Sequence, residues 1–496
     1  MSSINIYNLT FAYEGTYDNI FENVSFQMDT DWKLGFTGRN GRGKTTFLNL
    51  LLGKYEYKGT ISATVQFDYF PFQVDDNTLI TMEIIEDLHP DCAYWEIKKE
   101  LNLLQVDEDV LYRPFNTLSQ GEQTKVLLAV LFLREHHFLL IDEPTNHLDV
   151  TSRHVVCNYL NNKKGFILVS HDRAFLDGCT DHMLAINKTN IEIQKGNFSS
   201  WYHNKTLQDQ FELAENERLK KDIKRLTAAA KQTARWADKV ESSKIGMGKN
   251  SDEKSIDHRC YVGEKSRRMQ QRRKNLERRQ QSAIEEKSSL LKNIESTESL
   301  KLLTLPFYTT QLLRLLDVTL SYDTKVVCEK VRFEVSTGDR ICLQGKNGCG
   351  KSSVLKFILG EYIDYTGTFN KASGLKISYI SQDTSHLKGN LSDYARDCNI
   401  DETLFKSILR KLDFARVQFE KDIASFSEGQ KKKVLIAKSL SERAHLYIWD
   451  EPLNFIDIFS RIQIEQLLLA YQPTLIFVEH DESFTQQIAT EIIAIG

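Results

Sequence analysis

Short blocks of alternating apolar and polar residues occur at two places in the chain, and each set leads into a glycine-rich loop. These blocks are Ile4–Tyr7, Leu34–Thr37, Leu313–Leu320 and Arg340–Leu343. Their alternation predicts strands, and an apolar-faced helix is predicted directly after each loop, over Thr45–Leu52 and Ser352–Leu359. The pattern therefore predicts two similar units in one chain, residues 1–197 and 304–496.

Later apolar blocks in both units end in polar residues. One block precedes the pair Asp142-Glu143 or Asp450-Glu451, and the next, Phe166–Ser170 or Leu475–Glu479, precedes a histidine. Strands that place polar residues at their carboxyl ends are typical of a parallel sheet with its ligand at that edge. We therefore expect an α/β fold with two tandem P-loop domains.

Residues 198–303 follow a helical period instead. Apolar or small residues alternate at spacings of four and three at Leu219, Ile223, Leu226, Ala230, Thr233, Ala237 and Val240. A second series recurs every seven residues at Met269, Leu276, Ala283 and Leu290. The two series predict a long antiparallel coiled-coil hairpin with a polar tip loop at about residues 241–266. A helix of about forty residues spans on the order of 60 Å.

Charge is concentrated in this insert. The whole chain carries a net charge of −4, yet residues 218–279 hold 20 Lys and Arg against 8 Asp and Glu. Such asymmetry indicates a segment that meets a polyanion. The alternative is a solvated spacer between the two units, although a spacer needs neither the basic block nor a glycine-containing tip.

The glycine-rich loops both match GxxxxGK[ST], whose backbone N–H groups surround phosphates. Candidate ATP-binding residues in the first loop are Gly38, Asn40, Gly41, Gly43, Lys44, Thr45 and Thr46. Those in the second loop are Gly345, Asn347, Gly348, Gly350, Lys351, Ser352 and Ser353. We predict that the lysines reach the β- and γ-phosphates and that Thr45 and Ser352 bind Mg²⁺.

Further candidates recur in the same order about 308 residues apart. Asp142 and Asp450 are expected to hold Mg²⁺ through water, and Glu143 and Glu451 to polarise the attacking water. His171 and His480 follow strands and are expected to contact the γ-phosphate. A Ser-x-Gly motif opens a helix in each unit and offers N–H groups to an anion, at Ser119, Gly121, Glu122, Ser427, Gly429 and Gln430. Repetition of the whole set predicts a tandem ATPase that uses ATP and Mg²⁺.

With these motifs the chain resembles the ATP-binding cassette superfamily, whose units pair head to tail. The resemblance implies that Ser427 and Gly429 cover ATP at Lys44, and that Ser119 and Gly121 cover ATP at Lys351. It adds as candidates the adenine-stacking Tyr13 and Tyr322, the aspartates Asp149 and Asp457, and the Mg²⁺ ligands Gln73 and Gln382. Core packing is the alternative for the tyrosines, and Gln73 is displaced by one position. Thr145-Asn146-His147 becomes Leu453-Asn454-Phe455 in the second unit, which suggests unequal rates of hydrolysis.

Two fused cassettes, a charged helical linker and no apolar run of about 20 residues resemble the ABC-F family. The stretch Trp32–Thr45 and the long linker are similar to its antibiotic-resistance branch of Lsa/Vga type. This implies a monomer bound to the bacterial 70S ribosome, which meets 23S rRNA and peptidyl-site tRNA. It implies protection from lincosamides, pleuromutilins and streptogramin A, with the linker entering from the exit-tRNA side. Candidate RNA contacts are Lys231, Arg235, Trp236, Lys239, Lys244, Lys249, Arg267, Arg268, Arg272 and Arg273.

Two other functions share these motifs: the ATPase subunit of a drug exporter, and a general translation factor without resistance activity. The N-terminal residues show no basic region followed by an apolar run, so no secretion signal is expected. Eight cysteines without a CxxC pair fit a reducing compartment, and a cytoplasmic location is therefore expected.

Overall fold

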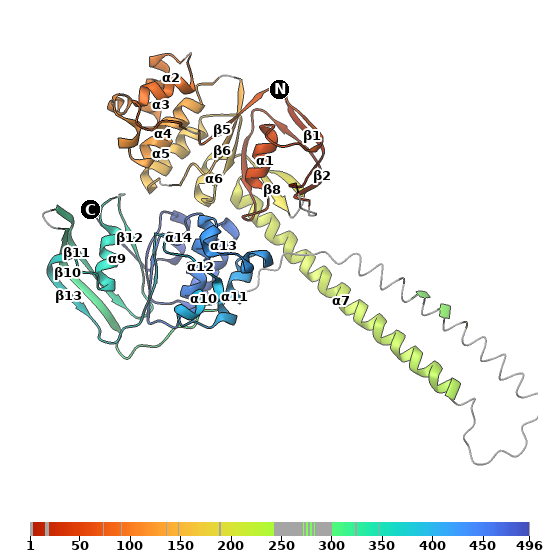
Figure 1. Ribbon diagram of the computed structural model, residues 1–496. Coiled ribbons are helices and arrows are strands. Elements are labelled where there is room, and N and C mark those ends of the chain that lie inside the picture. Colours follow the sequence, from red (N-terminus) through yellow and green to blue (C-terminus); the bar gives the residue numbers. More distant parts are fainter. Residues whose placement is uncertain are drawn as a thin grey trace, which may run out of the picture. The chain divides into compact units, whose positions relative to one another are not determined.

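The computed structural model describes residues 3–14, 19–72, 74–90, 92–134, 136–146, 148–187, 190–242, 300–322, 325–346 and 348–495. It also describes six further residues, 271, 274, 275, 278, 279 and 282. The chain separates into two compact units. One contains Met1–Trp201 together with Thr297–Gly496, and the other is Tyr202–Ser296. The first unit holds both predicted α/β bodies (Figure 1), so the two-cassette α/β fold is confirmed.

The first cassette is built on a six-stranded sheet. Its strand order is β5-β6-β7-β3-β8-β9, and all neighbours are parallel except the pair β8 and β9. The bounds are β3 (Lys33–Thr37), β5 (Gln66–Phe70), β6 (His137–Asp142), β7 (Phe166–Val169), β8 (His182–Asn187) and β9 (Asn190–Lys195). The phosphate loop, the Asp-Glu pair and His171 follow three neighbouring strands, so they meet at one edge.

A separate antiparallel sheet covers part of this cassette. It consists of β1 (Ser3–Phe11), β2 (Phe21–Asp29) and β4 (Lys58–Ser62), in the order β2-β1-β4. The predicted strand Ile4–Tyr7 therefore belongs to a different sheet from Leu34–Thr37. Alternation reveals a strand but not its partners, because Ile4, Ile6, Leu34 and Phe36 all face one shared core.

The second cassette repeats this plan. Its parallel sheet has the order β14-β15-β16-β12-β17, and its antiparallel sheet the order β11-β10-β13. The parallel strands are β12 (Arg340–Gln344), β14 (Ile377–Ile380), β15 (Leu446–Asp450), β16 (Leu475–Val478) and β17 (Glu491–Ala494). The antiparallel strands are β10 (Gln311–Tyr322), β11 (Lys325–Ser336) and β13 (Asp364–Lys371).

Strand β15 shows how the parallel sheet is held in place. Leu446 and Ile448 enter the core shared with the antiparallel sheet, whereas Tyr447 and Trp449 enter the core formed with the helices. Successive side chains point to opposite faces of a strand, so a strand covered on both sides is apolar throughout. Burial on both faces leaves the polar residue at its end, Asp450, in a fixed position.

Helices in the first cassette are α1 (Lys44–Leu51), α2 (Thr81–Leu88), α3 (Tyr94–Leu103), α4 (Gln120–Leu131), α5 (Val150–Asn161) and α6 (Arg173–Cys179), with 3₁₀ turns η1 (Glu108–Tyr112) and η2 (Phe115–Thr117). The second cassette has α9 (Lys351–Leu359), α10 (Leu391–Asp397), α11 (Glu402–Lys411), α12 (Glu428–Ser441), α13 (Ile458–Tyr471) and α14 (Glu482–Ile488), with η3 (Arg416–Glu420) and η4 (Ile423–Ser425). Helices α4 and α12 begin directly after Ser119 and Ser427, the serines of the two Ser-x-Gly motifs, which are called the signature motifs below.

The insert begins with α7 (Phe198–Ser242), a single helix of 45 residues (Figure 1). Its length is roughly 68 Å at 1.5 Å per residue, and it agrees with the predicted outgoing helix. The tip, and all but six single positions of the predicted return helix, lie outside the described residues. Within the described part of the chain, every helix is too short or too polar to span a membrane.

Candidate functional site

The phosphate loops have the same backbone geometry in both cassettes. Gly43 and Gly350 precede α1 and α9 and both have a φ of 94°. A Cβ at Gly43 would lie 2.6 Å from Ile20 Cγ2, and one at Gly350 would lie 2.8 Å from Val327 Cγ1. Both positions therefore need glycine for backbone angle and for space. The result is a helix N-terminus that points its N–H groups at the loop interior.

The loop lysines fold back over their own loops. Lys44 Nζ donates hydrogen bonds to Gly38 O at 2.6 Å and to Asn40 Oδ1 at 3.2 Å. Lys351 Nζ donates to Gly345 O at 2.8 Å and to Lys346 O at 2.9 Å. Burial lowers the pKa of Lys44, and the carboxylates of Asp457, Glu143 and Asp142 oppose that shift. Both ammonium groups are thus held where a phosphate would enter.

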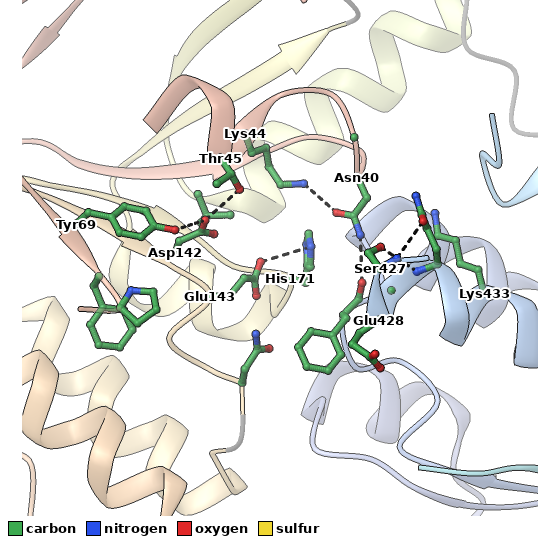
Figure 2. A pocket seen from close by; sticks show the side chains of 18 of the residues that line it. Asn40, Lys44, Thr45, Tyr69, Asp142, Glu143, His171, Ser427, Glu428 and Lys433 are labelled. Carbon is green, nitrogen blue, oxygen red and sulfur yellow. Dashed lines mark hydrogen bonds and ion pairs between the residues drawn. The ribbon is translucent and has the colours of Figure 1, made fainter. Parts of the chain in front are cut away.

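Asp142 lies across the loop from Lys44. Its Oδ2 accepts hydrogen bonds from Thr45 Oγ1 at 3.1 Å and from Tyr69 OH at 3.0 Å (Figure 2). Burial raises the pKa of Asp142, and these two hydrogen bonds oppose the shift. Sequence reasoning missed Tyr69, because a tyrosine near the end of a strand has no motif of its own.

The second cassette fits a cation at the matching place. Asp450 Oδ1 is buried and has no hydrogen-bond partner among the described residues. Burial raises the pKa of Asp450, although a hydrogen bond with Ser352 lowers it. An orphaned carboxylate oxygen beside a serine hydroxyl matches the hard oxygen donors that Mg²⁺ prefers.

Glu143 follows Asp142 in a left-handed conformation, with a φ of 51°. Its N–H donates to Val169 O at 2.9 Å, and its Oε1 lies 3.4 Å from His171 Nε2. Burial and the charge of Asp142 raise the pKa of Glu143 to about 8. Burial, with the charges of Lys44 and Arg461, lowers the pKa of His171 well below its ordinary value. The histidine is therefore neutral at pH 7.

Glu451 has the same backbone conformation but different side-chain partners. Its Oε2 accepts hydrogen bonds from Gln382 Nε2 at 2.9 Å and from Asn454 Nδ2 at 2.7 Å, and its Oε1 lies 3.4 Å from His480 Nε2. Burial raises the pKa of Glu451, but the hydrogen bond and charge of His480 and two lysine charges outweigh it. The pKa of Glu451 therefore lies below its ordinary value. Sequence reasoning did not assign Asn454 to the site. Asn454 follows Glu451 by three residues, as Asn146 follows Glu143.

The structure brings the two cassettes together around a cavity of about 840 Å³. From the first cassette it is lined by Lys44, Asp142 and Glu143, and from the second by Ser427 and Gly429. Figure 2 shows Ser427 across the space from Lys44 and Thr45. Asn40 Nδ2 also reaches Phe455 O of the second cassette, at 3.1 Å.

A second cavity of about 760 Å³ reverses the contributions. It is lined by Lys351, Ser352 and Glu451 of the second cassette and by Ser119 and Gly121 of the first. Each cavity therefore combines one phosphate loop with the Ser-x-Gly motif of the other cassette. This arrangement presents two helix N-termini to one ligand.

Each signature serine caps its own helix. Ser119 Oγ accepts the Glu122 N–H at 3.2 Å, and the Glu122 carboxylate accepts the Ser119 N–H at 2.8 Å. Ser427 and Gln430 repeat this capping box at 3.4 Å and 3.1 Å. Glu122 and Gln430 are thus engaged in ordering the motif. Their predicted contact with ATP remains a prediction.

Other predicted contacts are placed less directly. Tyr13 OH bonds Thr46 Oγ1 at 2.8 Å and Tyr322 OH donates to Ser353 Oγ at 3.5 Å. Neither tyrosine is among the residues that line the two cavities described above, although both are over 40 % exposed. Asp149 lines the second cavity, whereas the buried Asp457 bonds Lys433 Nζ at 2.8 Å and lines neither.

Further polar contacts join the cassettes beside the cavities. Arg153 Nη1 donates to His480 O at 3.1 Å and pairs with Asp172 at 2.8 Å. His154 Nε2 lies 2.8 Å from Glu482 Oε1, and the partly buried Arg173 pairs with Glu465 at 2.8 Å. Arg153 thus links the helix after one Asp-Glu pair to the histidine of the other site.

Several predicted residues lie outside the described part of the chain. These are Gln73, Asn347, Lys244, Lys249, Arg267, Arg268, Arg272 and Arg273. The backbone of α7 includes Arg235, Trp236 and Lys239, whose side chains are not described, and Lys231 is exposed on it. The structure therefore leaves the predicted RNA contacts as predictions.

Tandem P-loop cassettes with reciprocal Ser-x-Gly motifs define a class of nucleotide-hydrolysing proteins. The chain matches the ABC transporter family over residues 21–146 and 328–454, about half of its length, and it belongs to this family. It is an ATPase with two ATP-binding cassettes.

Similarity to curated relatives extends over nearly the whole chain. The chain is 25 % identical to the ribosome protection protein VmlR of Bacillus subtilis, covering 98 % of this chain and 85 % of that protein. It is 25 % identical to the putative ATP-binding protein YdiF of Bacillus subtilis (97 % and 78 % covered) and 26 % identical to the ATP-binding protein Uup of Buchnera aphidicola (99 % and 80 %).

A solved structure shares the fold. An archaeal ribosome recycling factor, crystallised with an archaeal ribosomal stalk protein, superposes with a TM-score of 0.63 at 16 % identity. The match covers 98 % of this chain and 87 % of that one. At this identity the likeness concerns the fold alone.

Proposed function

We propose that each composite cavity binds one ATP with Mg²⁺. Lys44 and Lys351 would hold the β- and γ-phosphates, and the signature motif of the opposite cassette would cover the γ-phosphate. Thr45 and Asp142 in one site, and Ser352, Asp450 and Gln382 in the other, would hold Mg²⁺, with Gln73 as a further candidate. Bound Mg²⁺ supplies positive charge that offsets the charge developing on the transferred phosphoryl group.

In this proposal Glu143 and Glu451 polarise the attacking water, and the paired histidines orient it. Support comes from their placement at the sheet edge, each glutamate 3.4 Å from its histidine. Because ATP joins surfaces of both cassettes, binding favours the closed pair and hydrolysis releases it. The different hydrogen-bond partners of the two glutamates support unequal rates at the two sites.

We further propose an ABC-F protein of the Lsa/Vga type that protects ribosomes. The cassettes would bind the bacterial 70S ribosome as a monomer in the cytoplasm, and the linker would extend from the exit-tRNA side toward 23S rRNA and peptidyl-site tRNA. There it would displace tRNA and lincosamides, pleuromutilins or streptogramin A. The observation that carries this proposal is the similarity to a ribosome protection protein over 98 % of the chain, linker included.

The proposed boundaries are residues 1–197 and 304–496 for the cassettes and 198–303 for the linker. Helix α7 supplies a reach of roughly 68 Å. The charge of residues 218–279, 20 basic against 8 acidic, favours phosphate contacts whose affinity falls with salt.

A general translation factor is the second candidate. It is favoured by the relatives YdiF and Uup, which are named only as ATP-binding proteins and are as similar as VmlR. The ATPase subunit of an exporter, the third candidate, shares the family but has no evident use for a long basic linker.

Cell-free bacterial translation inhibited by a lincosamide or a pleuromutilin tests the proposal. Purified protein with ATP should restore synthesis, and because no membrane is present, rescue excludes export. A matched variant with residues 242–264 replaced by a short Gly/Ser loop should keep its ATPase activity and lose rescue. No rescue by the intact protein, at concentrations where it binds ribosomes, would favour the general factor.

A further inference from the structure

Among the positions at which the two cassettes differ, three lie around the turn that carries the catalytic glutamate and exchange polar groups. Thr124, Thr145 and Ser170 of the first cassette correspond to Lys432, Leu453 and Glu479 of the second. Three neutral hydroxyl groups in the first cassette are thus replaced in the second by a cation, an apolar side chain and a carboxyl group. Lys432 and Glu479 are only 3 % and 5 % exposed. Burying opposite charges is costly unless each is paired, so their joint presence calls for a role.

Lys432 lies on α12 and reaches two backbone carbonyls. Its Nζ donates to Glu451 O at 3.1 Å and to Ser381 O at 3.1 Å. Ser381 precedes Gln382, whose amide donates to the Glu451 carboxylate at 2.9 Å. One ammonium group therefore links the backbone of Glu451 to the backbone carbonyl directly before Gln382, the residue whose side chain meets the Glu451 carboxylate.

Glu479 holds the same turn from the opposite side. Its Oε1 accepts the Leu453 N–H at 2.7 Å, and its Oε2 accepts the His480 N–H at 3.2 Å. The Glu479 carboxyl group thus links Leu453, in the turn after Glu451, to His480, the residue beside Glu451 Oε1. Burial lowers the pKa of Lys432, and the charges of Glu479 and Glu451 oppose that shift.

The first cassette has different contacts at these positions. Thr124 Oγ1 donates to Gln120 O of its own helix at 2.9 Å, and its side chain is too short to replace the lysine. Thr145 Oγ1 lies 3.2 Å from Ser170 Oγ, a contact between two side chains. The backbone of the Glu143 turn receives neither the cation nor the carboxyl group.

We propose that Lys432 and Glu479 are positioning residues of the second ATP site, which hold the Glu451 turn from both sides and fix its carboxylate against Gln382 and His480. This inference rests on the proposed role of Glu451 in polarising water. It makes the second site chemically distinct from the first through Lys432, which lines the second cavity, and through Glu479, which is not among the residues that line it.

The test uses a parent with Glu143→Gln, in which turnover comes from the second site and is measured by steady-state hydrolysis of ATP with Mg²⁺. Lys432→Thr and Glu479→Ser should each lower kcat by about 10- to 100-fold, the range for displaced catalytic groups, and leave KM for ATP unchanged. Lys432→Arg keeps a long donor and should recover part of the loss. Lys438→Thr, which removes a lysine paired with Glu442 on the same helix, should behave as the parent.

Equal kcat in the parent, Lys432→Thr and Glu479→Ser would overturn the inference, as would a change confined to KM. If a single variant fails to fold, the triple variant Lys432→Thr, Leu453→Thr, Glu479→Ser decides, because it carries the neutral set of the first cassette. Adding Glu451→Gln to the parent should stop turnover. Continued hydrolysis there would refute the role of Glu451 itself, a failure separate from that of the two positioning residues.

Discussion

Glu143 and Glu451 share a backbone conformation and a neighbouring histidine, yet their pKa values shift in opposite directions. Burial and Asp142 raise the pKa of Glu143 to about 8. Around Glu451, burial acts in the same direction but His480 and two lysines outweigh it. A base must be ionised to accept a proton, so the two sites should respond differently to pH.

The first prediction concerns that response. Glu451→Gln leaves only the first site, whose kcat/KM should rise about tenfold per pH unit below pH 8 and level off above it, because only the ionised Glu143 accepts the proton. Glu143→Gln leaves the second site, whose kcat/KM should stay nearly flat from pH 6.5 to 8.5, since Glu451 is already ionised. Steady-state ATPase assays across this range measure both profiles. Two profiles of the same shape would contradict the assigned environments.

At the scale of elements, the N-termini of α4 and α12 have two tasks. Ser119 and Ser427 close capping boxes with Glu122 and Gln430, which order the first helical turn. The same residues line the cavity that contains the phosphate loop of the other cassette. Helix stability and the proposed contact with ATP therefore depend on the same hydroxyl groups.

Substituting these serines one at a time separates the two tasks. Ser427→Ala and Ser119→Ala should each cost about 1 kcal/mol of unfolding free energy, the usual value of an N-cap. In a Glu451→Gln parent, where only the first site turns over, Ser427→Ala should lower ATPase activity strongly and Ser119→Ala should not. Chemical denaturation and ATPase assays on the same preparations measure both effects. A larger loss with Ser119→Ala than with Ser427→Ala would show that each signature motif serves its own cassette, and equal losses would contradict the reciprocal assignment.

At the scale of the molecule, hydrogen bonds connect the two sites without passing through nucleotide. Arg153 contacts the carbonyl of His480, and Asn40 contacts the carbonyl of Phe455. Both carbonyls belong to segments that line the second cavity. Under the proposed function, we expect closure of one site to change the backbone environment of the other, which would be the physical basis for coupled turnover.

The whole-molecule prediction uses a variant that binds ATP but cannot cleave it. Glu143→Gln with Glu451→Gln should hold ATP, hydrolyse it poorly and stay closed, because the water is no longer polarised. Under the proposed function this variant should co-sediment with bacterial ribosomes in low salt when ATP is present. Lys44→Ala with Lys351→Ala, which removes both phosphate-binding lysines, is the matched control and should stay in the supernatant. If the Glu143→Gln, Glu451→Gln variant also stays in the supernatant with ATP, closure on ATP does not drive ribosome binding.

Much of the two ATP sites could be predicted from the sequence, because many of their contacts join residues that are close together in the chain. Lys44 bonds Gly38 and Asn40 within its own loop, and Ser119 bonds Glu122 one helical turn away. Contacts over such short separations follow from residue type and spacing. The two-cassette α/β fold and the ATPase activity were predicted from these motifs and confirmed. The tip and nearly all of the return helix stay predictions.

What only the tertiary structure decided involves residues far apart in sequence. Three features depend on which strands and helices pack together. They are the separate antiparallel sheet around Ile4, the contact of Tyr69 with Asp142, and the contacts of Lys432 and Glu479 with the Glu451 turn. The opposite pKa shifts of Glu143 and Glu451 have the same origin, because burial and neighbouring charge exist only after packing. The sequence by itself determined which chemical groups each site contains, and packing determined how each group is solvated and held.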